Sequence, residues 1–444
     1  MRGESRLVLI ACYLAIFAVG ENSTAIMAAL PAMSARLGLG RAEVEWAVNA
    51  YLLASAAFII LGGRAADGFG ARRSSAAGVL LFALASLIIA LAPDGAAVIA
   101  ARALQGLGAA FAVAGSLAAV AEAVPEAGRA AAISGWTGFL MLGFSIGPLL
   151  GGAVTHYAGW RVVFSLNLAM MLPAGLALAA KPGAPGREAG GVDWPGLGLL
   201  VLFMVTMVSG LQALARFAQA PWDAILLLLV AVVALLLLYR TERRRDHPLL
   251  DFALFQNRRF TLAVLIASLM MFDIMTLLLY YNLFAQSLRG LALTPIAAGL
   301  SLVPLSVALF GFARVAPRIA EAVGLRRMMV GGGLILVLGC AIAVVSLAVA
   351  GPVLRVIGLF AIGAGIALPY ATAPRLGLAA LPETEAGQGS GVISACTFLS
   401  ATIGVTGGGI VSGFAGFAGV LLLVALAALA SAALSLRIKE KARS

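Results

Sequence analysis

A short charged stretch at residues 63–73 decides the fold, and it reads GRAADGFGARR. A related stretch at residues 317–327 reads PRIAEAVGLRR. Each stretch joins two apolar runs that are long enough to cross a membrane, since a spanning helix takes about 20 apolar residues. The two halves of the chain therefore look like an internal repeat of membrane helices joined by similar tight loops.

The composition agrees with a membrane protein. The chain has 444 residues, of which 62% are hydrophobic and 11% are charged, whereas soluble domains carry about 25% charged residues. This excludes a large soluble domain. The formal net charge of +11 resembles that of nucleic-acid-binding proteins, but the basic residues form short clusters at the ends of apolar runs. That distribution is typical of membrane loops.

The apolar runs predict fourteen membrane-spanning helices. Placing the N-terminus in the cytoplasm assigns most of the 30 lysine and arginine residues to cytoplasmic loops and tails, as the positive-inside rule requires. The even number puts both termini on that side, and we interpret the N-terminal run as a retained first helix rather than a cleaved signal peptide. The expected spans are 7–31, 44–63, 74–92, 96–121, 131–153, 162–180, 196–214, 223–239, 260–285, 296–315, 326–349, 353–373, 388–412 and 414–436.

Two unusual loops suggest the domain organisation. Residues 181–195 are rich in glycine and proline, and residues 239–259 carry a dense basic cluster. We predict a six-helix bundle at 1–180, a linker with two inserted helices and a basic cytoplasmic loop at 181–259, and a second six-helix bundle with a short basic tail at 260–444. The fold class is then an all-α membrane protein with two bundles related by pseudo-twofold symmetry.

The loop at 63–73 has the composition of a gate. Gly63 and Gly70 permit a tight turn, and Asp67 can accept hydrogen bonds from helix N-terminal amides or pair with Arg72 and Arg73. A charged clasp of this kind would hold one conformation shut and release it in another. The alternative is an ordinary positively charged membrane loop.

The helix expected at 96–121 carries a buried charge. It contains ARALQGLGAA at 101–110, which places Arg102 inside an apolar span at a cost of roughly 2.5–3.5 kcal/mol. Arg102 should therefore face a partner or a wet cavity, unless its side chain reaches out to the interface.

The helix expected at 131–153 contains GFSIGPLLGG at 143–152. Pro148 frees a backbone carbonyl and favours a bend, while small residues make one face nearly bare. We expect a functional bend; the alternative is a plain packing surface. The bare face consists of Gly143, Gly147, Gly151 and Gly152.

These three stretches resemble the signature loop, the fourth-helix motif and the antiporter motif of the major facilitator superfamily. Further stretches resemble its branch of fourteen-helix drug:proton antiporters, and the resemblance covers nearly the whole chain. It implies transport by alternating access. The additional matching stretches are ALP at 29–31, WAVNAYLLA at 46–54, WRVVFSLN at 160–167, DWPGLGLL at 193–200 and HPLLDFALFQNRRF at 247–260.

The chain departs from the family pattern at one informative position. The family usually has an aspartate seven residues before its Ala-Leu-Pro, where this chain has Asn22, and the nearest acid is Glu21. A shift by one residue turns a side chain by about 100° around a helix. Gly68 and Ala71 also stand where the family prefers basic residues.

Two acids lie in the middle of predicted spans, at equivalent depth in the first helix of each half. Glu21 and Asp273 are costly there unless they are protonated or face water, so we expect them to carry protons or bind substrate; a structural ion pair is the alternative. We further expect Arg102 to pair with Glu21. Thr276, Tyr280 and Asn282, which follow Asp273, are candidate cavity walls or plain packing residues.

The sequence contains no pattern of an enzyme or metal site. The two histidines, His156 and His247, form no metal-binding motif, and the three cysteines sit singly in apolar runs. We therefore expect no catalytic residues, cofactor or metal ion.

The function favoured is proton-coupled export of amphipathic small molecules or drugs across a bacterial cytoplasmic membrane. The expected partners are the substrate, protons and the lipid bilayer, with no nucleic acid, and the protein is expected to be a monomer. A dedicated metabolite exporter, a proton symporter and a transport-inactive receptor or scaffold are the alternatives.

Overall fold

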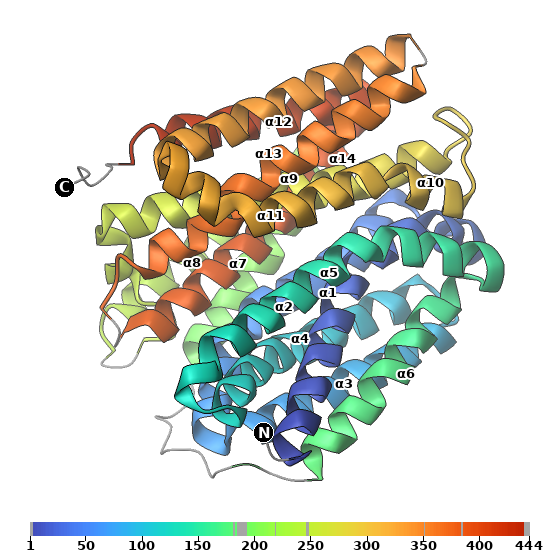
Figure 1. Cartoon of the computed structure of the whole chain (residues 1–444). Helices are drawn as coiled ribbons and strands as arrows, with labels where there is room; N and C mark the ends of the chain where they lie inside the picture. Colours follow the sequence, from blue (N-terminus) through green and yellow to red (C-terminus); the bar gives the residue numbers. More distant parts are fainter. Residues whose placement is uncertain are drawn as a thin grey trace. The chain divides into compact units, whose positions relative to one another are not determined.

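The computed structural model describes residues 3–180, 183, 193–217, 219–245, 248–349, 351–382 and 385–438. Within these ranges all regular secondary structure is helical (Figure 1). Thirteen of the described helices are long and apolar enough to cross a membrane. The prediction of an all-α membrane protein is confirmed.

The first six helices pack against one another. Among them α1 packs on α4, α5 and α6, α4 packs on α2 and α3, and α3 packs on α6. Glycines allow these close approaches. If Gly78 of α3 carried a side chain, its Cβ would lie only 2.7 Å from the Gly108 carbonyl oxygen of α4, which is too close for a real Cβ atom. The bounds are α1 Gly3–Leu37, α2 Arg41–Phe69, α3 Ala71–Leu91, α4 Gly95–Ala123, α5 Glu126–Ala158 and α6 Trp160–Ala179.

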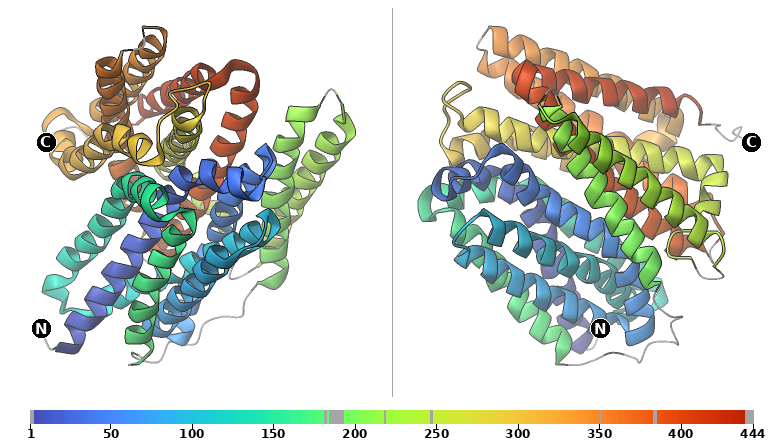
Figure 2. Two further views of the ribbon diagram at one scale, coloured as in Figure 1. Left: turned by 90° about the vertical axis from the view of Figure 1, so that its right-hand side faces the viewer. Right: turned by 180° about the vertical axis from the view of Figure 1, so that it is seen from behind.

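Two further helices follow, α7 Trp194–Ala213 and α8 Pro221–Glu242. The short 3₁₀ helix η1 Leu214–Arg216 follows α7, and η2 Phe252–Gln256 follows α8. Figure 2 shows α7 and α8 as an antiparallel pair. Much of the α8 surface is exposed and apolar, as expected for a helix that faces lipid. At one end of the pair Asp193 accepts a hydrogen bond from Gly196 N (2.8 Å) and forms an ion pair with Arg245 (3.1 Å). Most of the predicted linker at 181–195 lies outside the described residues.

The C-terminal part repeats the packing pattern of the first six helices. In it α13 packs on α11 and α12, as α4 packs on α2 and α3, and α12 packs on α14. The bounds are α9 Arg258–Gln286, α10 Pro295–Ser301, α11 Val303–Val323, α12 Leu325–Ala348, α13 Pro352–Leu378 and α14 Ala386–Ser435.

Two spans differ in detail from the sequence prediction. The span expected at 296–315 is broken between α10 and α11 and extends to Val323. The spans expected at 388–412 and 414–436 merge into α14, in which Gly416 alone has a non-helical backbone (φ 60°, ψ −160°). Dividing α14 at Gly416 gives the fourteen predicted spans, because only a single left-handed residue separates the last two.

The two halves share the same loop geometry at their repeated motifs. Gly70, between α2 and α3, has φ 95° and ψ 141°, and Gly324, between α11 and α12, has φ 93° and ψ 142°. Both values lie in a region that strongly favours glycine. The internal repeat read from the sequence is therefore also a repeat of backbone conformation.

The chain divides into two compact units. One comprises Met1–Val205, Ala234–Leu249 and Gln286–Leu300, and the other comprises Thr206–Val233, Leu250–Ala285 and Ser301–Ser444. The site described below is built separately within each unit.

Candidate functional site

The first unit contains a buried network of polar side chains from five of its helices. Gln105 of α4 is at its centre: Gln105 Nε2 donates to Ser86 Oγ of α3 (2.7 Å), and Asn22 Nδ2 of α1 donates to Gln105 Oε1 (3.3 Å). Asn167 Nδ2 of α6 donates to Asn22 Oδ1 (2.9 Å). All four side chains are fully buried. Most buried polar groups in proteins are hydrogen-bonded, and these bonds link α1, α3, α4 and α6 at one depth.

Arg102 supplies the charge of this network. Its side chain is fully buried, donates from Nε to the Ala47 carbonyl (2.8 Å), and donates from Nη1 to Gln105 Oε1. The guanidinium lies over the ring of Tyr51 on α2, 4.3 Å from the ring centroid, in a cation–π arrangement. Arg102 therefore does not reach out to the interface, and it is held by neutral groups.

Glu21 is buried separately from Arg102. Its side chain is 1% exposed, and neither carboxylate oxygen has a hydrogen-bond partner among the described residues. Our prediction of an Arg102–Glu21 ion pair is wrong for this structure. The reason is the rotation of one residue along α1: Asn22 faces α4 and α6, whereas the backbone at Glu21 lies against α5.

The glycine face of α5 makes that contact. A Cβ at Gly143 would lie 2.7 Å from Glu21 N, and a Cβ at Gly147 would lie 2.7 Å from Glu21 O. At Gly151 a Cβ would lie 2.7 Å from the Cα of Ala25. α5 is continuous from Glu126 to Ala158 with Pro148 inside it. These glycines bring α1 and α5 together at the level of the buried acid.

The C-terminal end of the same face meets the start of α10. A Cβ at Gly152 would lie 3.1 Å from the Pro295 carbonyl carbon, and a Cβ at Gly299 would lie 2.6 Å from the Pro148 carbonyl oxygen. The α10 backbone can approach the Pro148 carbonyl this closely because residue 299 is a glycine. A functional bend at Pro148 stays a prediction.

Asp273 of α9 is the corresponding acid of the second unit. It is fully buried, and in the part of the chain that the structure describes neither carboxylate oxygen has a hydrogen-bond partner. The residues that follow it bond to backbone carbonyls: Thr276 to Phe272 (2.6 Å), Tyr280 to Val405 (2.8 Å) and Asn282 to Leu278 (2.9 Å). These contacts are those of packing residues.

The loop at 63–73 places its predicted gate residues at the surface. Asp67 and Arg73 are exposed and Arg72 is partly buried. Asp67 makes no hydrogen bond or ion pair with the described residues. Gly63 lies inside α2, where a Cβ would meet nothing within 4 Å, so of the two predicted turn glycines only Gly70 is required by the backbone.

Sequence reasoning missed several members of the polar network. Asn167 and Tyr51 lie within the stretches WRVVFSLN and WAVNAYLLA, yet they were not singled out, and Ser86 has no local signal. Arg64 was missed too: its Nη2 donates to the Pro248 carbonyl (2.7 Å), which ties the end of α2 to the segment after α8. A polar residue on an otherwise apolar helix face would have been the signal for Asn167.

Comparison with known proteins agrees with this architecture. The family model described as Major Facilitator Superfamily matches residues 12–405. The chain is 32% identical over 409 residues to Multidrug resistance protein Stp of Mycobacterium tuberculosis, covering 91% of this chain and 75% of that protein. It is 30% identical over 413 residues to Drug efflux pump JefA of the same organism, covering 91% and 80%.

A solved structure shows the same fold. The xylose transporter XylE from E. coli, in a partially occluded inward-open conformation, has a TM-score of 0.67 and 14% sequence identity, with 99% of this chain and 100% of that chain covered. Family match, relatives and fold agree, and the chain is a multi-pass membrane transporter that belongs to the Major Facilitator Superfamily.

Proposed function

We propose that the protein exports amphipathic small molecules or drugs in exchange for protons, by alternating access. One observation carries the proton coupling: within the described residues, each half of the chain contains one fully buried carboxyl group without a hydrogen-bond partner, Glu21 in the first and Asp273 in the second. An unpaired carboxylate in such a place is costly as an ion and much less costly as a neutral acid. A change of access that wets the group therefore changes its proton occupancy.

The direction of transport is proposed from the relatives, which are named as a multidrug resistance protein and a drug efflux pump. The glycine face of α5 supports the proton coupling rather than the direction, because this face brings the α1 backbone at Glu21 directly against α5. A conformational change that slides these two helices would alter the surroundings of the carboxyl group.

We also propose the orientation and setting. Both termini face the cytoplasm of a bacterial cell, the protein acts as a monomer, and the helices α7 and α8 are an insertion between bundles at 1–180 and 260–444. Single cysteines placed at Asp94 and at Phe69 test the orientation, since a membrane-impermeant thiol reagent should label the first in intact cells and the second only after permeabilisation. The reverse labelling pattern would refute the orientation.

Purified protein in proteoliposomes tests the function. A panel of lipophilic cations is added to vesicles with an imposed proton gradient, and the internal pH is followed with a trapped dye. Antiport predicts that substrate dissipates the gradient as it accumulates against its own concentration gradient. Proton uptake together with substrate indicates a symporter, and no response to any compound favours a receptor or scaffold.

A further inference from the structure

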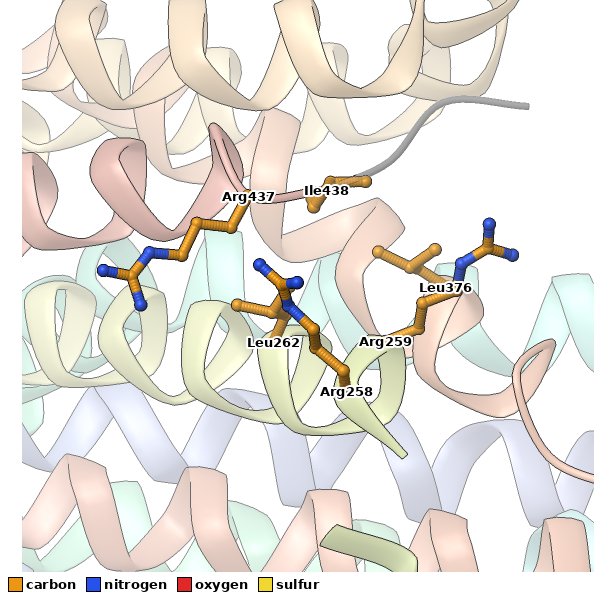
Figure 3. Close-up of a pocket in the computed structure, with 6 residues that line it drawn as sticks. All are labelled: Arg258, Arg259, Leu262, Leu376, Arg437 and Ile438. Atoms are coloured by element: carbon orange, nitrogen blue, oxygen red, sulfur yellow. The ribbon is translucent and has the colours of Figure 1, made fainter. Parts of the chain in front are cut away.

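A basic pocket lies at one end of the second unit, where α9 begins, α13 ends and the chain leaves α14. It is lined by Arg258, Arg259, Leu262, Leu376, Arg437 and Ile438 (Figure 3). Three arginines and three aliphatic residues therefore share one small recess. Of the part of the chain that the structure describes, no acidic residue lines it.

No acidic side chain among the described residues forms an ion pair with the three arginines. Their side chains are exposed and make no hydrogen bond or ion pair with the described residues. Arg258 and Arg259 also occupy the first turn of α9, where the helix macrodipole favours negative charge and disfavours cations. The backbone N–H groups of Arg259 and Phe260 are already bonded to Asn257 Oδ1 (3.0 and 3.3 Å), so the arginine side chains are the donors left for a ligand. Their charge and their place in the first turn of α9 favour an anionic ligand.

The remaining wall of the pocket is apolar. Leu262 and Ile438 belong to a buried cluster that also contains Ile266, Met329 and Leu368, and Leu376 packs against the same cluster. Figure 3 shows the Arg258 side chain rising beside Leu262, with Arg437 on the opposite side. A ligand that fits this recess has an anionic group next to an apolar part.

The position of the recess identifies the source of such a ligand. α9 is a membrane-spanning helix that starts at Arg258, so the recess lies where a span meets the membrane surface. Anionic phospholipids present a phosphate at this level, above acyl chains. We propose that the recess binds the phosphodiester headgroup of an anionic phospholipid, with the arginines on the phosphate and the aliphatic side chains against the glycerol and upper acyl region.

Native mass spectrometry of the full chain in detergent micelles tests this proposal with phosphatidylglycerol as the probe. The wild type should retain one phosphatidylglycerol more tightly than phosphatidylcholine. The double variant Arg258→Gln/Arg437→Gln should weaken that binding by at least about tenfold, since each basic residue near an anionic lipid surface contributes a factor of about five. Both side chains are exposed, so the double variant keeps the fold.

The control variant removes two positive charges outside the recess. Arg240→Gln/Arg244→Gln neutralises two exposed arginines at the end of α8 and should leave phosphatidylglycerol binding unchanged. Leu376→Gln should weaken binding of phosphatidylglycerol while all three arginines remain. Unchanged lipid binding in the Arg258→Gln/Arg437→Gln variant would overturn the proposal. Complete displacement of the lipid by millimolar inorganic phosphate would also overturn it, because the recess would then be a site for soluble anions.

Discussion

Asn22 and Gln105 are joined through their side-chain amides: Asn22 Nδ2 lies 3.3 Å from Gln105 Oε1, and Gln105 Nε2 lies 3.4 Å from Asn22 Oδ1. Because Arg102 donates to the same Gln105 oxygen, a neutral amide pair stands where the family pattern leads one to expect a carboxylate near an arginine. Arg102 is thus linked through Gln105 to the side of α1 that carries Asn22. Glu21 lies on another side of α1, where the backbone contacts α5.

The first prediction concerns the shape of Arg102. A lysine cannot reproduce a planar guanidinium that bonds to Ala47 and Gln105 while it covers the ring of Tyr51. We expect Arg102→Lys to cost about 1.5–3 kcal/mol of stability, the value of a lost hydrogen bond to a charged group. Thermal melting in detergent measures it. Arg129→Lys is the control, because exposed Arg129 also donates to a carbonyl (Ala121, 3.1 Å), and equal melting of the two variants contradicts the role of Arg102.

The second prediction separates the glycines of the charged loop. Gly70 and Gly324 have φ near 95°, so Gly70→Ala and Gly324→Ala should each cost about 1–3 kcal/mol through backbone strain. Gly63→Ala adds a methyl group within a helix, where nothing lies within 4 Å, and should be neutral or slightly stabilising. Melting temperatures of the three variants provide the measurement. A destabilised Gly63→Ala beside an unaffected Gly70→Ala reverses the expected order.

The third prediction concerns the contact between α1 and α5. A methyl group at Gly143 would press on the α1 backbone at Glu21, whereas one at Gly138 of the same helix meets nothing within 4 Å. Gly143→Ala should therefore cost about 1–3 kcal/mol through overpacking and slow transport, and Gly138→Ala should do neither. Melting and transport assays on both variants check this. Normal melting and transport by Gly143→Ala would show that the close contact is unnecessary.

The fourth prediction assigns Asp67 to gating. Because Asp67 is exposed at the end of α2, Asp67→Asn should lower kcat while KM changes by less than about twofold, which is the signature of a lost conformational step rather than lost binding. Arg72→Ala should behave alike. Initial transport rates at several substrate concentrations separate the two constants, and an altered KM at unchanged kcat argues for a binding role instead.

Sequence reasoning found the features that depend on chain order. Apolar runs predict the spans, and the similar stretches at 63–73 and 317–327 predict an internal repeat. In the structure Gly70 and Gly324 of these stretches have nearly the same backbone conformation. The sequence also predicts a break between the spans 388–412 and 414–436, and the structure has it at Gly416, where one left-handed residue interrupts α14.

The contacts of the site required the structure. The rotation of α1 about its axis decides that Asn22 rather than Glu21 meets Gln105. Neighbouring residues lie at almost the same depth but point in different directions, so depth in the sequence cannot decide between them. Similarly, the sequence places Arg102 inside the membrane, but only the fold shows that Tyr51, Gln105 and a backbone carbonyl are its partners.

Proton movement in proteoliposomes with Glu21→Gln and Asp273→Asn tests the central claim most directly. Each substitution removes a titratable group with little change of volume, and Asp223→Asn, at an exposed acid of α8, is the matched control. We predict that substrate-driven proton movement is abolished or strongly reduced in both buried-acid variants, with normal folding, and is unchanged in Asp223→Asn. Full proton-coupled export by both Glu21→Gln and Asp273→Asn would contradict the account.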